Sequence, residues 1–220
     1  NTIQLGDVRN IKAKDLPKID LLCGGSPCQD FSQANKERKG LKGEKSSLFF
    51  EYVRLLKELK PKYFLLENVS MDDYSYQFIS ETLGTYPVNI NSELVSGQLR
   101  QRSYWTNIGS ESFDLFGNRY SMIPQPKNKN IMLQDILESG KTDRQKSLCI
   151  MARYKTSAPI RAKYEKRYKM GMLQIVYDNE HRLLTTKEIE RLQTVPEGYV
   201  DNVPGISENM KANLLGDGWT

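Results

Sequence analysis

The sequence predicts an α/β fold in which a mainly parallel sheet carries helices on its faces. Short apolar runs alternate with longer amphipathic stretches through the first half of the chain. Gly or Pro stands at the ends of several of these segments, where a strand or a helix would stop. Strand–loop–helix alternation is typical of parallel sheets, in which ligands and catalytic groups collect at the carboxyl ends of the strands.

The elements expected in the first half follow from the spacing of their apolar residues. IDLLC and YFLLENV are short, mostly apolar runs, as buried strands are, whereas SSLFFEYVRLLKELK has a helical stripe of apolar residues that stops before Pro61. Gly84 would end the next helix, because glycine accepts the left-handed conformation common at that position. We expect strands at 19–23, 63–69, 88–95 and 103–109 and helices at 46–60 and 73–84.

The second half begins at a boundary marked by Pro124 and Pro126, after which the pattern is weaker, more polar and basic. Regular structure returns at Thr185, which forms a capping box with Glu188 for a helix that stops at Pro196. A last helix is expected over 207–216, capped by Ser207 and ended by Gly216. The chain therefore divides into residues 1–123, 124–182 and 183–220.

Composition excludes several classes of protein. The mean hydropathy of −0.60 leaves no stretch near the roughly 20 apolar residues that cross a bilayer, so no membrane association is expected. Three cysteines (Cys23, Cys28 and Cys149) are an odd and sparse set, which favours a reducing compartment, cytoplasmic or, in a eukaryote, nuclear. His181 is the only histidine, so neither a metal site nor a Ser-His-Asp triad is expected.

Positive charge is concentrated in one segment. The net charge of the chain is +5, but residues 141–169 contain ten Lys or Arg against Asp143 and Glu165. Tyrosines are interleaved with these cations, a mixture that suits the phosphate backbone of a nucleic acid. A solvated helix face with inward-packed tyrosines would have the same composition, and the segment alone leaves both interpretations open.

Candidate catalytic groups follow the strands. Cys28 lies in the loop GGSPCQDFSQ after the first strand, where a lowered pKa would make its thiolate a nucleophile. Glu67 closes the neighbouring strand, beside Asn68, and could donate a proton. Arg100 and Arg102, two residues apart on a strand, would point to the same face and supply positive charge. Taken singly, each also has an ordinary structural interpretation as a loop residue, a strand-end charge or a salt-bridge partner.

The order of these segments adds information. PCQ, followed by ENV and then by QLRQR, resembles the DNA cytosine-5 methyltransferase family, and the similarity extends through most of the chain. The resemblance implies a Rossmann-like, S-adenosylmethionine-dependent methyltransferase fold with a small target-recognition region at 124–182. Residues 1–123 and 183–220 would then form the catalytic domain, and RLLTTKEIERLQTVPEGY would order the recognition region. KERKGLKGEKSSLFFEYVRLL is most similar to the de novo type of enzyme.

The resemblance also implies roles for individual residues. Catalytic residues would be Cys28, Glu67, Gln98, Arg100 and Arg102. Cofactor contacts would come from Asp7, Pro27, Leu48, Asp217 and Trp219, with Asp7 at the adenine. Substrate contacts would come from Ser26, Gln29, Asn68, Arg161 and Lys163.

The implied reaction is covalent. The target cytosine would leave the stack of double-stranded DNA, because its C5 and C6 atoms are otherwise inside it. Cys28 would add to C6 and Glu67 would hydrogen-bond the N3/N4 edge, so that C5 accepts the methyl group. Arg102 would contact the base near O2, and Arg100 would position the pocket or a phosphate.

The chain departs from the family pattern at its first motif. The Phe-x-Gly-x-Gly loop that holds the cofactor and the acidic residue after it are absent, and Asp217 stands where Asn is common. We therefore expect a missing N-terminal segment, or a second subunit of a split enzyme, to carry that motif. Two other functions remain open, namely the same chemistry on tRNA and a non-catalytic DNA-binding or regulatory relative, although the latter would be expected to lose Cys28 or Glu67.

Overall fold

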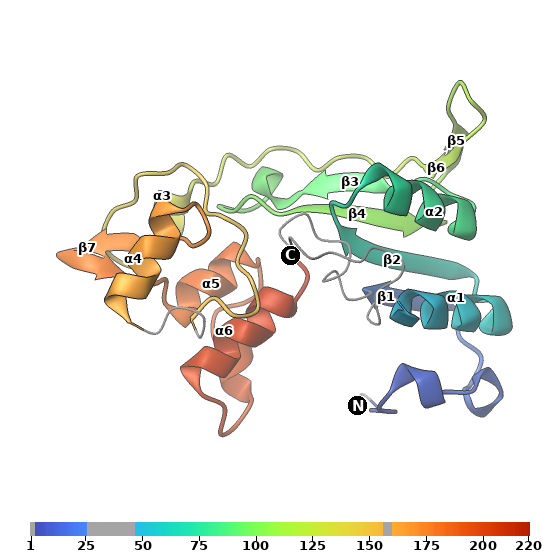
Figure 1. Ribbon diagram of the computed structural model, residues 1–220, viewed down its shortest axis with the longest axis horizontal. Helices are drawn as coiled ribbons and strands as arrows, with labels where there is room; N and C mark the ends of the chain where they lie inside the picture. Colours follow the sequence, from blue (N-terminus) through green and yellow to red (C-terminus); the bar gives the residue numbers. More distant parts are fainter. Residues whose placement is uncertain (1–2, 26–46, 156–159) are drawn as a thin grey trace. The chain divides into compact units, whose positions relative to one another are not determined.

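The computed structural model describes residues 3–25, 47–155 and 160–220 (Figure 1). These residues form two compact units. Unit 1 comprises Asn1–Ile90 and Gln101–Gln125, and unit 2 comprises Asn91–Arg100 and Pro126–Thr220. Throughout these described ranges, every helix is too short or too polar to cross a membrane.

Unit 1 is built on a four-stranded sheet in the order β1-β2-β4-β3. Its strands are β1 (Leu21–Gly25), β2 (Tyr63–Val69), β3 (Val88–Asn91) and β4 (Gln101–Thr106). The pair β1–β2 is parallel, as expected, but β4 runs antiparallel to β2, so the sheet is mixed rather than mainly parallel. The connection from β3 to β4, Ser92–Arg100, is shorter than the roughly dozen residues that a crossover between parallel strands needs. A connection of this length does not allow β4 to follow β3 in the same direction.

Two helices cover one face of this sheet. They are α1 (Ser47–Leu59) and α2 (Asp73–Leu83), and they contact each other through the rings of Phe49 and Phe78, whose centroids lie 6.3 Å apart. Under them, Leu66 of β2 and Trp105 of β4 are fully buried. The left-handed Gly84, with φ of 68°, ends α2 and confirms the predicted helix stop.

Two smaller features of unit 1 had no strong signal in the sequence. The N-terminal segment contains the 3-10 helices η1 (Val8–Asn10) and η2 (Ala13–Asp15), and a hairpin pairs β5 (Glu111–Phe113) with β6 (Arg119–Ser121). The guanidinium of Arg54 on α1 fixes the N-terminal segment, because its Nη2 donates to the carbonyl oxygens of Val8 (3.2 Å) and Ile11 (2.9 Å).

Unit 2 has its own apolar core, to which the weakly patterned region contributes Leu133, Ile150, Tyr154 and Val176. Its elements are η5 (Ser92–Leu94), α3 (Leu133–Ile136), α4 (Arg161–Lys169), β7 (Val176–Asp178), β8 (Glu180–Arg182), α5 (Thr186–Leu192), η6 (Tyr199–Asn202) and α6 (Glu208–Asp217). Figure 1 draws α4, α5 and α6 in orange to red. The boundary expected at residue 182 separates a recognition region from the catalytic domain, whereas these two units are defined by compactness alone. The boundary at 182 therefore stays a prediction.

The capping signals of the last two helices are confirmed. Thr185 accepts a hydrogen bond from the backbone N–H of Glu188 at 3.1 Å, and the Glu188 carboxylate accepts from the N–H of Thr185 at 2.8 Å. Ser207 caps α6 through the N–H of Met210 at 3.3 Å. The helix continues one residue past the predicted stop at Gly216. Glycine is needed at 216 because the backbone there passes Met151 so closely that a side chain would clash.

Candidate active site

An arginine–glutamate pair lies between β2 and β4. Nε of Arg102 is 2.7 Å from Oε1 of Glu67, and the two side chains are only 15% and 13% exposed. In the antiparallel ladder Val69 is opposite Arg102 and Glu67 is opposite Tyr104, so the pair is a diagonal neighbour on one face. A guanidinium in contact with a carboxylate fixes the orientation of its oxygens.

The alternation of β2 decides which face the pair occupies. Phe64, Leu66 and Asn68 are buried on the side of α1 and α2, whereas Glu67 points to the opposite face. Asn68 is 1% exposed, and its Oδ1 accepts from the N–H of Val69 at 2.8 Å. The structure therefore brings Arg102, but not the Asn68 side chain, to the Glu67 face.

The predicted nucleophile belongs to the strand beside this pair. Gly25 at the end of β1 is in register with Glu67. The residues that follow, including Ser26, Pro27, Cys28 and Gln29, lie outside the described residues. In the sequence, Cys28 is separated from Gly25 by only two residues, so its loop starts at the strand position next to Glu67.

An apolar cleft of about 320 Å³ opens beside β1. Its lining residues are Val8, Leu22, Cys23, Gly24, Gly25, Leu48, Tyr52 and Leu55. A Cβ on Gly24 would come within 2.6 Å of the Tyr52 ring, so glycine is needed for α1 to pack this closely. The Tyr52 hydroxyl donates to the carbonyl oxygen of Leu22 at 3.3 Å, and burial raises the pKa of Tyr52.

Asp7 is adjacent in sequence to the Val8 that lines this cleft. Its carboxylate caps η1 by accepting from the backbone N–H of Arg9 at 3.0 Å and from Nε of the same residue at 2.9 Å. These hydrogen bonds lower the pKa of Asp7 to about 2, so its carboxylate is ionised at neutral pH. The apolar lining of the cleft fits a flat ring, and Asp7 is the ionised carboxylate nearest to it in the sequence.

Gln98 and Arg100 are buried inside unit 2. The Gln98 amide donates to the carbonyl oxygen of Leu192 at 2.8 Å. The Arg100 guanidinium donates to the carbonyl oxygens of Ile150 (3.1 Å) and Gly218 (2.7 Å). Both side chains therefore bind the backbone of their own unit and connect the segment before β4 to the ends of α5 and α6.

The remaining predicted contacts also belong to unit 2. Asp217 is exposed at the end of α6, and Trp219 is 41% exposed. Arg161 is engaged by two carboxylates, with Nε 2.8 Å from Glu165 and Nη1 2.7 Å from Glu180. Lys163 is exposed on the same helix and has no ion pair within the described part of the chain.

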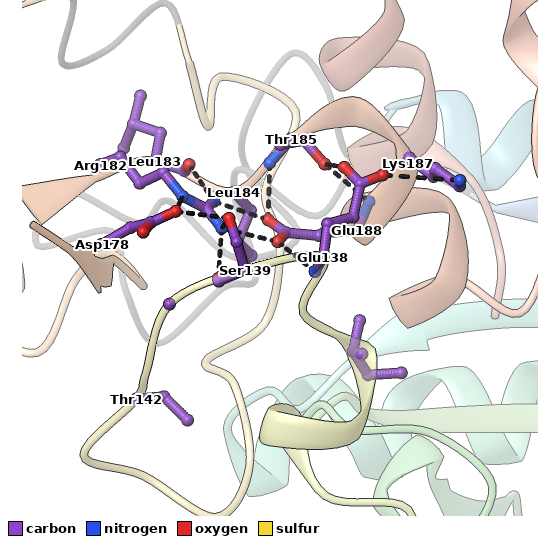
Figure 2. A network of polar contacts seen from close by, with 12 residues as sticks. Glu138, Ser139, Thr142, Asp178, Arg182, Leu183, Leu184, Thr185, Lys187 and Glu188 are labelled. Carbon is purple, nitrogen blue, oxygen red and sulfur yellow. Dashed lines mark hydrogen bonds and ion pairs between the residues drawn. The ribbon is translucent and has the colours of Figure 1, made fainter.

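A second arginine–glutamate pair, which the sequence did not reveal, connects β8 to α5 (Figure 2). Both terminal nitrogens of Arg182 donate to the fully buried Glu188 carboxylate at 2.9 Å. That carboxylate also accepts from the N–H groups of Thr185 (2.8 Å) and Glu138 (2.9 Å). The capping box was visible in the sequence, but the partner six residues earlier was not.

Residues 3–25, 47–155 and 160–220 contain no group of three or more His, Cys, Asp or Glu side chains that could hold a metal ion.

Solved structures identify the fold as that of a methyltransferase. The chain resembles the Entamoeba histolytica methyltransferase EhMeth with a TM-score of 0.69 and 14% identity, over 100% of this chain and 79% of that one. It resembles the S. pombe Dnmt2 methyltransferase with a TM-score of 0.60 and 17% identity, over 97% and 78%. The predicted methyltransferase fold class is thereby confirmed.

Sequence comparison finds similar proteins among the cytosine-specific DNA methylases. Residues 1–72 match the family model "C-5 cytosine-specific DNA methylase". The orphan methyltransferase M.Rho11sI of Bacillus phage rho11s is 32% identical over 99% of this chain and 43% of its own length. The type II methyltransferase M1.ScrFI of Lactococcus lactis subsp. cremoris is 33% identical over 63% and 38%. The chain is therefore similar to C-5 cytosine-specific DNA methylases, and it spans less than half the length of these relatives.

Proposed function

We propose that this chain carries the catalytic groups of a DNA (cytosine-5-)-methyltransferase, which moves a methyl group from S-adenosylmethionine to C5 of a flipped-out cytosine. One observation supports this most strongly. The Glu67–Arg102 pair lies next to Gly25, where the loop that bears Cys28 begins. Consecutive Cα atoms are 3.8 Å apart, so the chain keeps Cys28 within about 11 Å of Gly25.

Three side chains would carry the chemistry. The Cys28 thiolate would add to C6 of the flipped base, which divides a difficult substitution into easier steps. The Glu67 carboxyl would hydrogen-bond the N3/N4 edge, and its contact with Arg102 would hold it in the orientation that this requires. Arg102 would also face O2 of the base. Gln98 and Arg100 would act as positioning residues through the backbone carbonyls they bind in unit 2.

The cleft beside β1 suits the adenine of S-adenosylmethionine, the compound that supplies the methyl group. Val8 and Leu48 would contact the faces of the ring, and the Asp7 carboxylate would accept from its amino group. Pro27, Asp217 and Trp219 would complete the site, as the resemblance implies. The prediction is specific, since an apolar slot without an acceptor would not distinguish adenine from other rings.

The rest of the cofactor site would come from a complementing segment, either N-terminal or on a second subunit. Among the described strands of the sheet, β1 is at one edge and has no partner on that side. On the face away from α1, Leu21 is 47% exposed and Cys23 is exposed. Parallel strands are normally covered on both faces, so β1 is suited to accept another strand and its helix.

The basic region 124–182 would recognise double-stranded DNA, with residues 183–220 returning to the catalytic domain. Lys163 would contact a phosphate of the DNA. Arg161 would stabilise the recognition region through its ion pairs with Glu165 and Glu180, either in addition to a DNA contact or instead of one. Ser26 and Gln29 would line the pocket for the flipped base, whereas Asn68, which was expected there, is buried on the opposite face from Glu67.

The proposal is tested with the complete protein, labelled S-adenosylmethionine and matched duplex DNA and tRNA. We expect label in DNA at C5 of cytosine and no label in tRNA. Transfer to tRNA alone would replace the proposed substrate, and transfer to neither, with cofactor binding intact, would favour a non-catalytic role.

A further inference from the structure

Three side chains of unit 2 form a row on one face of the β7–β8 hairpin. Tyr177 is opposite His181 in this hairpin. Lys141 lies on the other side of Tyr177, and the two residues exchange backbone hydrogen bonds of 2.7 and 2.9 Å. Residues directly opposite each other in antiparallel strands present their side chains on the same face. Lys141, Tyr177 and His181 are therefore neighbours across three strands.

The backbone geometry of the row depends on Gly140. This residue has φ of +83°, and an added Cβ would lie 2.5 Å from the carbonyl oxygen of Tyr177. Only glycine combines this conformation with so close an approach of the two strands. The position of Lys141 beside Tyr177 is thus a fixed property of the backbone.

The His181 ring is held from behind. Its Nδ1 is 2.8 Å from Oε1 of Glu165, which is itself bound by Arg161. The rings of His181 and Tyr177 meet edge to face with centroids 5.7 Å apart. In the neutral tautomer whose Nδ1–H donates a hydrogen bond to Glu165, the other ring nitrogen, Nε2, is a hydrogen-bond acceptor.

The row borders a cleft of about 350 Å³, which has the buried Ile175 at its base and Tyr168 in its wall. The Asp143 carboxylate in the same cleft accepts from the Tyr168 hydroxyl, and the Arg144 guanidinium lies 4.9 Å from the Tyr168 ring centroid. Within the part of the chain that the structure describes, Lys141 forms no ion pair with a carboxylate. Its ammonium group is therefore available to an outside acceptor.

We propose that this row reads a G·C base pair of the DNA next to the target cytosine, an inference that rests on the proposed function. A lysine has only donors, and guanine presents the acceptors N7 and O6 in the major groove. The N4 amino group of the paired cytosine is a donor, which matches Nε2 of His181 as an acceptor. A two-stranded ribbon fits the width of that groove, and the +8 charge of residues 141–169 favours its approach to DNA.

The experiment measures methylation of a duplex library with randomised bases around one cytosine, using the complete protein and bisulfite sequencing. The variants are Lys141→Met and His181→Ala, and Lys127→Met, an exposed lysine outside the row, is the matched control. We expect the ratio of methylation with G·C to methylation with other base pairs to fall about tenfold in both row variants, at the same flanking position. Lys127→Met should keep the original profile.

Two outcomes overturn the inference. In the first, the unaltered protein methylates the library but Lys141→Met and His181→Ala keep its profile or relax different positions, and the proposed function survives alone. In the second, the unaltered protein methylates no cytosine, which removes the proposed function and this inference together. Thermal unfolding of each variant, compared with the unaltered protein, separates a change in readout from a loss of fold.

Discussion

Two of the arginine–glutamate pairs of this protein, Glu67–Arg102 and Glu188–Arg182, have different surroundings. Glu67 and Arg102 lie on a face of a sheet and keep 13% and 15% of their side chains exposed. Glu188 has no exposed side-chain surface and accepts hydrogen bonds from both terminal nitrogens of Arg182 and from two backbone N–H groups. A partly exposed carboxylate can still meet a substrate, whereas an enclosed one can only hold the structure together. The same two residue types thus suit the proposed catalytic role in unit 1 and a structural role in unit 2.

The largest effect is expected from Glu67→Gln in the complete protein. The amide can keep a hydrogen bond to Arg102 but cannot supply the proton or the charge that the reaction uses. We expect kcat to fall about 10²- to 10⁴-fold, while the free energy of unfolding changes by less than about 1 kcal/mol. Steady-state kinetics and urea unfolding check the two expectations. If Glu67→Gln instead lowered the free energy of unfolding as much as Glu188→Gln does, Glu67 would be a structural residue like Glu188.

The matched change, Glu188→Gln, should lower stability much more than Glu67→Gln does. It removes the charge that compensates Arg182 inside unit 2 and disturbs four hydrogen bonds to the carboxylate. We expect the free energy of unfolding to fall by about 3 kcal/mol. The double variant Arg182→Leu, Glu188→Leu is the control, because removing both charges should cost less than removing one. Equal losses in the single and double variants would show that the pair is not coupled.

The pH dependence of stability should report on the same region. A hydrogen bond from Thr185 and the charge of Lys187 lower the pKa of Glu138, and a hydrogen bond from Ser139 lowers the pKa of Asp178. A carboxyl group with a lowered folded pKa stabilises the protein above its unfolded pKa and loses that contribution as the pH falls. We therefore expect the Tm to be level above about pH 5 and to fall below about pH 4.

The variant Glu138→Gln checks this assignment. Its Tm should depend less on pH between about 5 and 3 than that of the unaltered protein, because one titrating group has been removed. An unchanged acid transition would assign the effect to other carboxylates.

The smallest expected effect concerns two cations on α4. Lys163 is exposed, whereas Arg161 already contacts Glu165 and Glu180. For the complete protein, Lys163→Ala should reduce the slope of log affinity for DNA against log salt by about one, and Arg161→Ala by less. Titrations at several salt concentrations measure both slopes. An unchanged slope for Lys163→Ala would remove this helix from the DNA interface.

The sequence predicted unit 1 better than unit 2. The strand at 63–69 and the helix stop at Gly84 were predicted because apolar spacing and a left-handed glycine are local signals. The prediction of a mainly parallel sheet was wrong at β4, because the direction of a strand depends on where it inserts into the sheet rather than on its residues. The hairpin at 176–182 was missed because each strand has three residues, although Asp178 and Asn179 are typical of a turn.

The candidate site shows the same division. Glu67 and Arg102 could be assigned to one site because the resemblance names both, and alternation within a strand fixes the face of each. Arg100 was expected to position the pocket or a phosphate, but its donors bind carbonyl groups far away in the sequence. Such contacts depend on how separate segments pack together, which spacing does not encode. The roles of Cys28 and its neighbours stay predictions.

The central claim is that Cys28 and the Glu67–Arg102 pair act on a cytosine in DNA. Its most direct test is the intact mass of the complete protein after incubation with S-adenosylmethionine and duplex DNA that carries 5-fluorocytosine at the target position. The account predicts a covalent adduct that maps to Cys28 and is lost in Cys28→Ser. An adduct that forms only with RNA, that survives Cys28→Ser, or that never forms despite cofactor and DNA binding would contradict it.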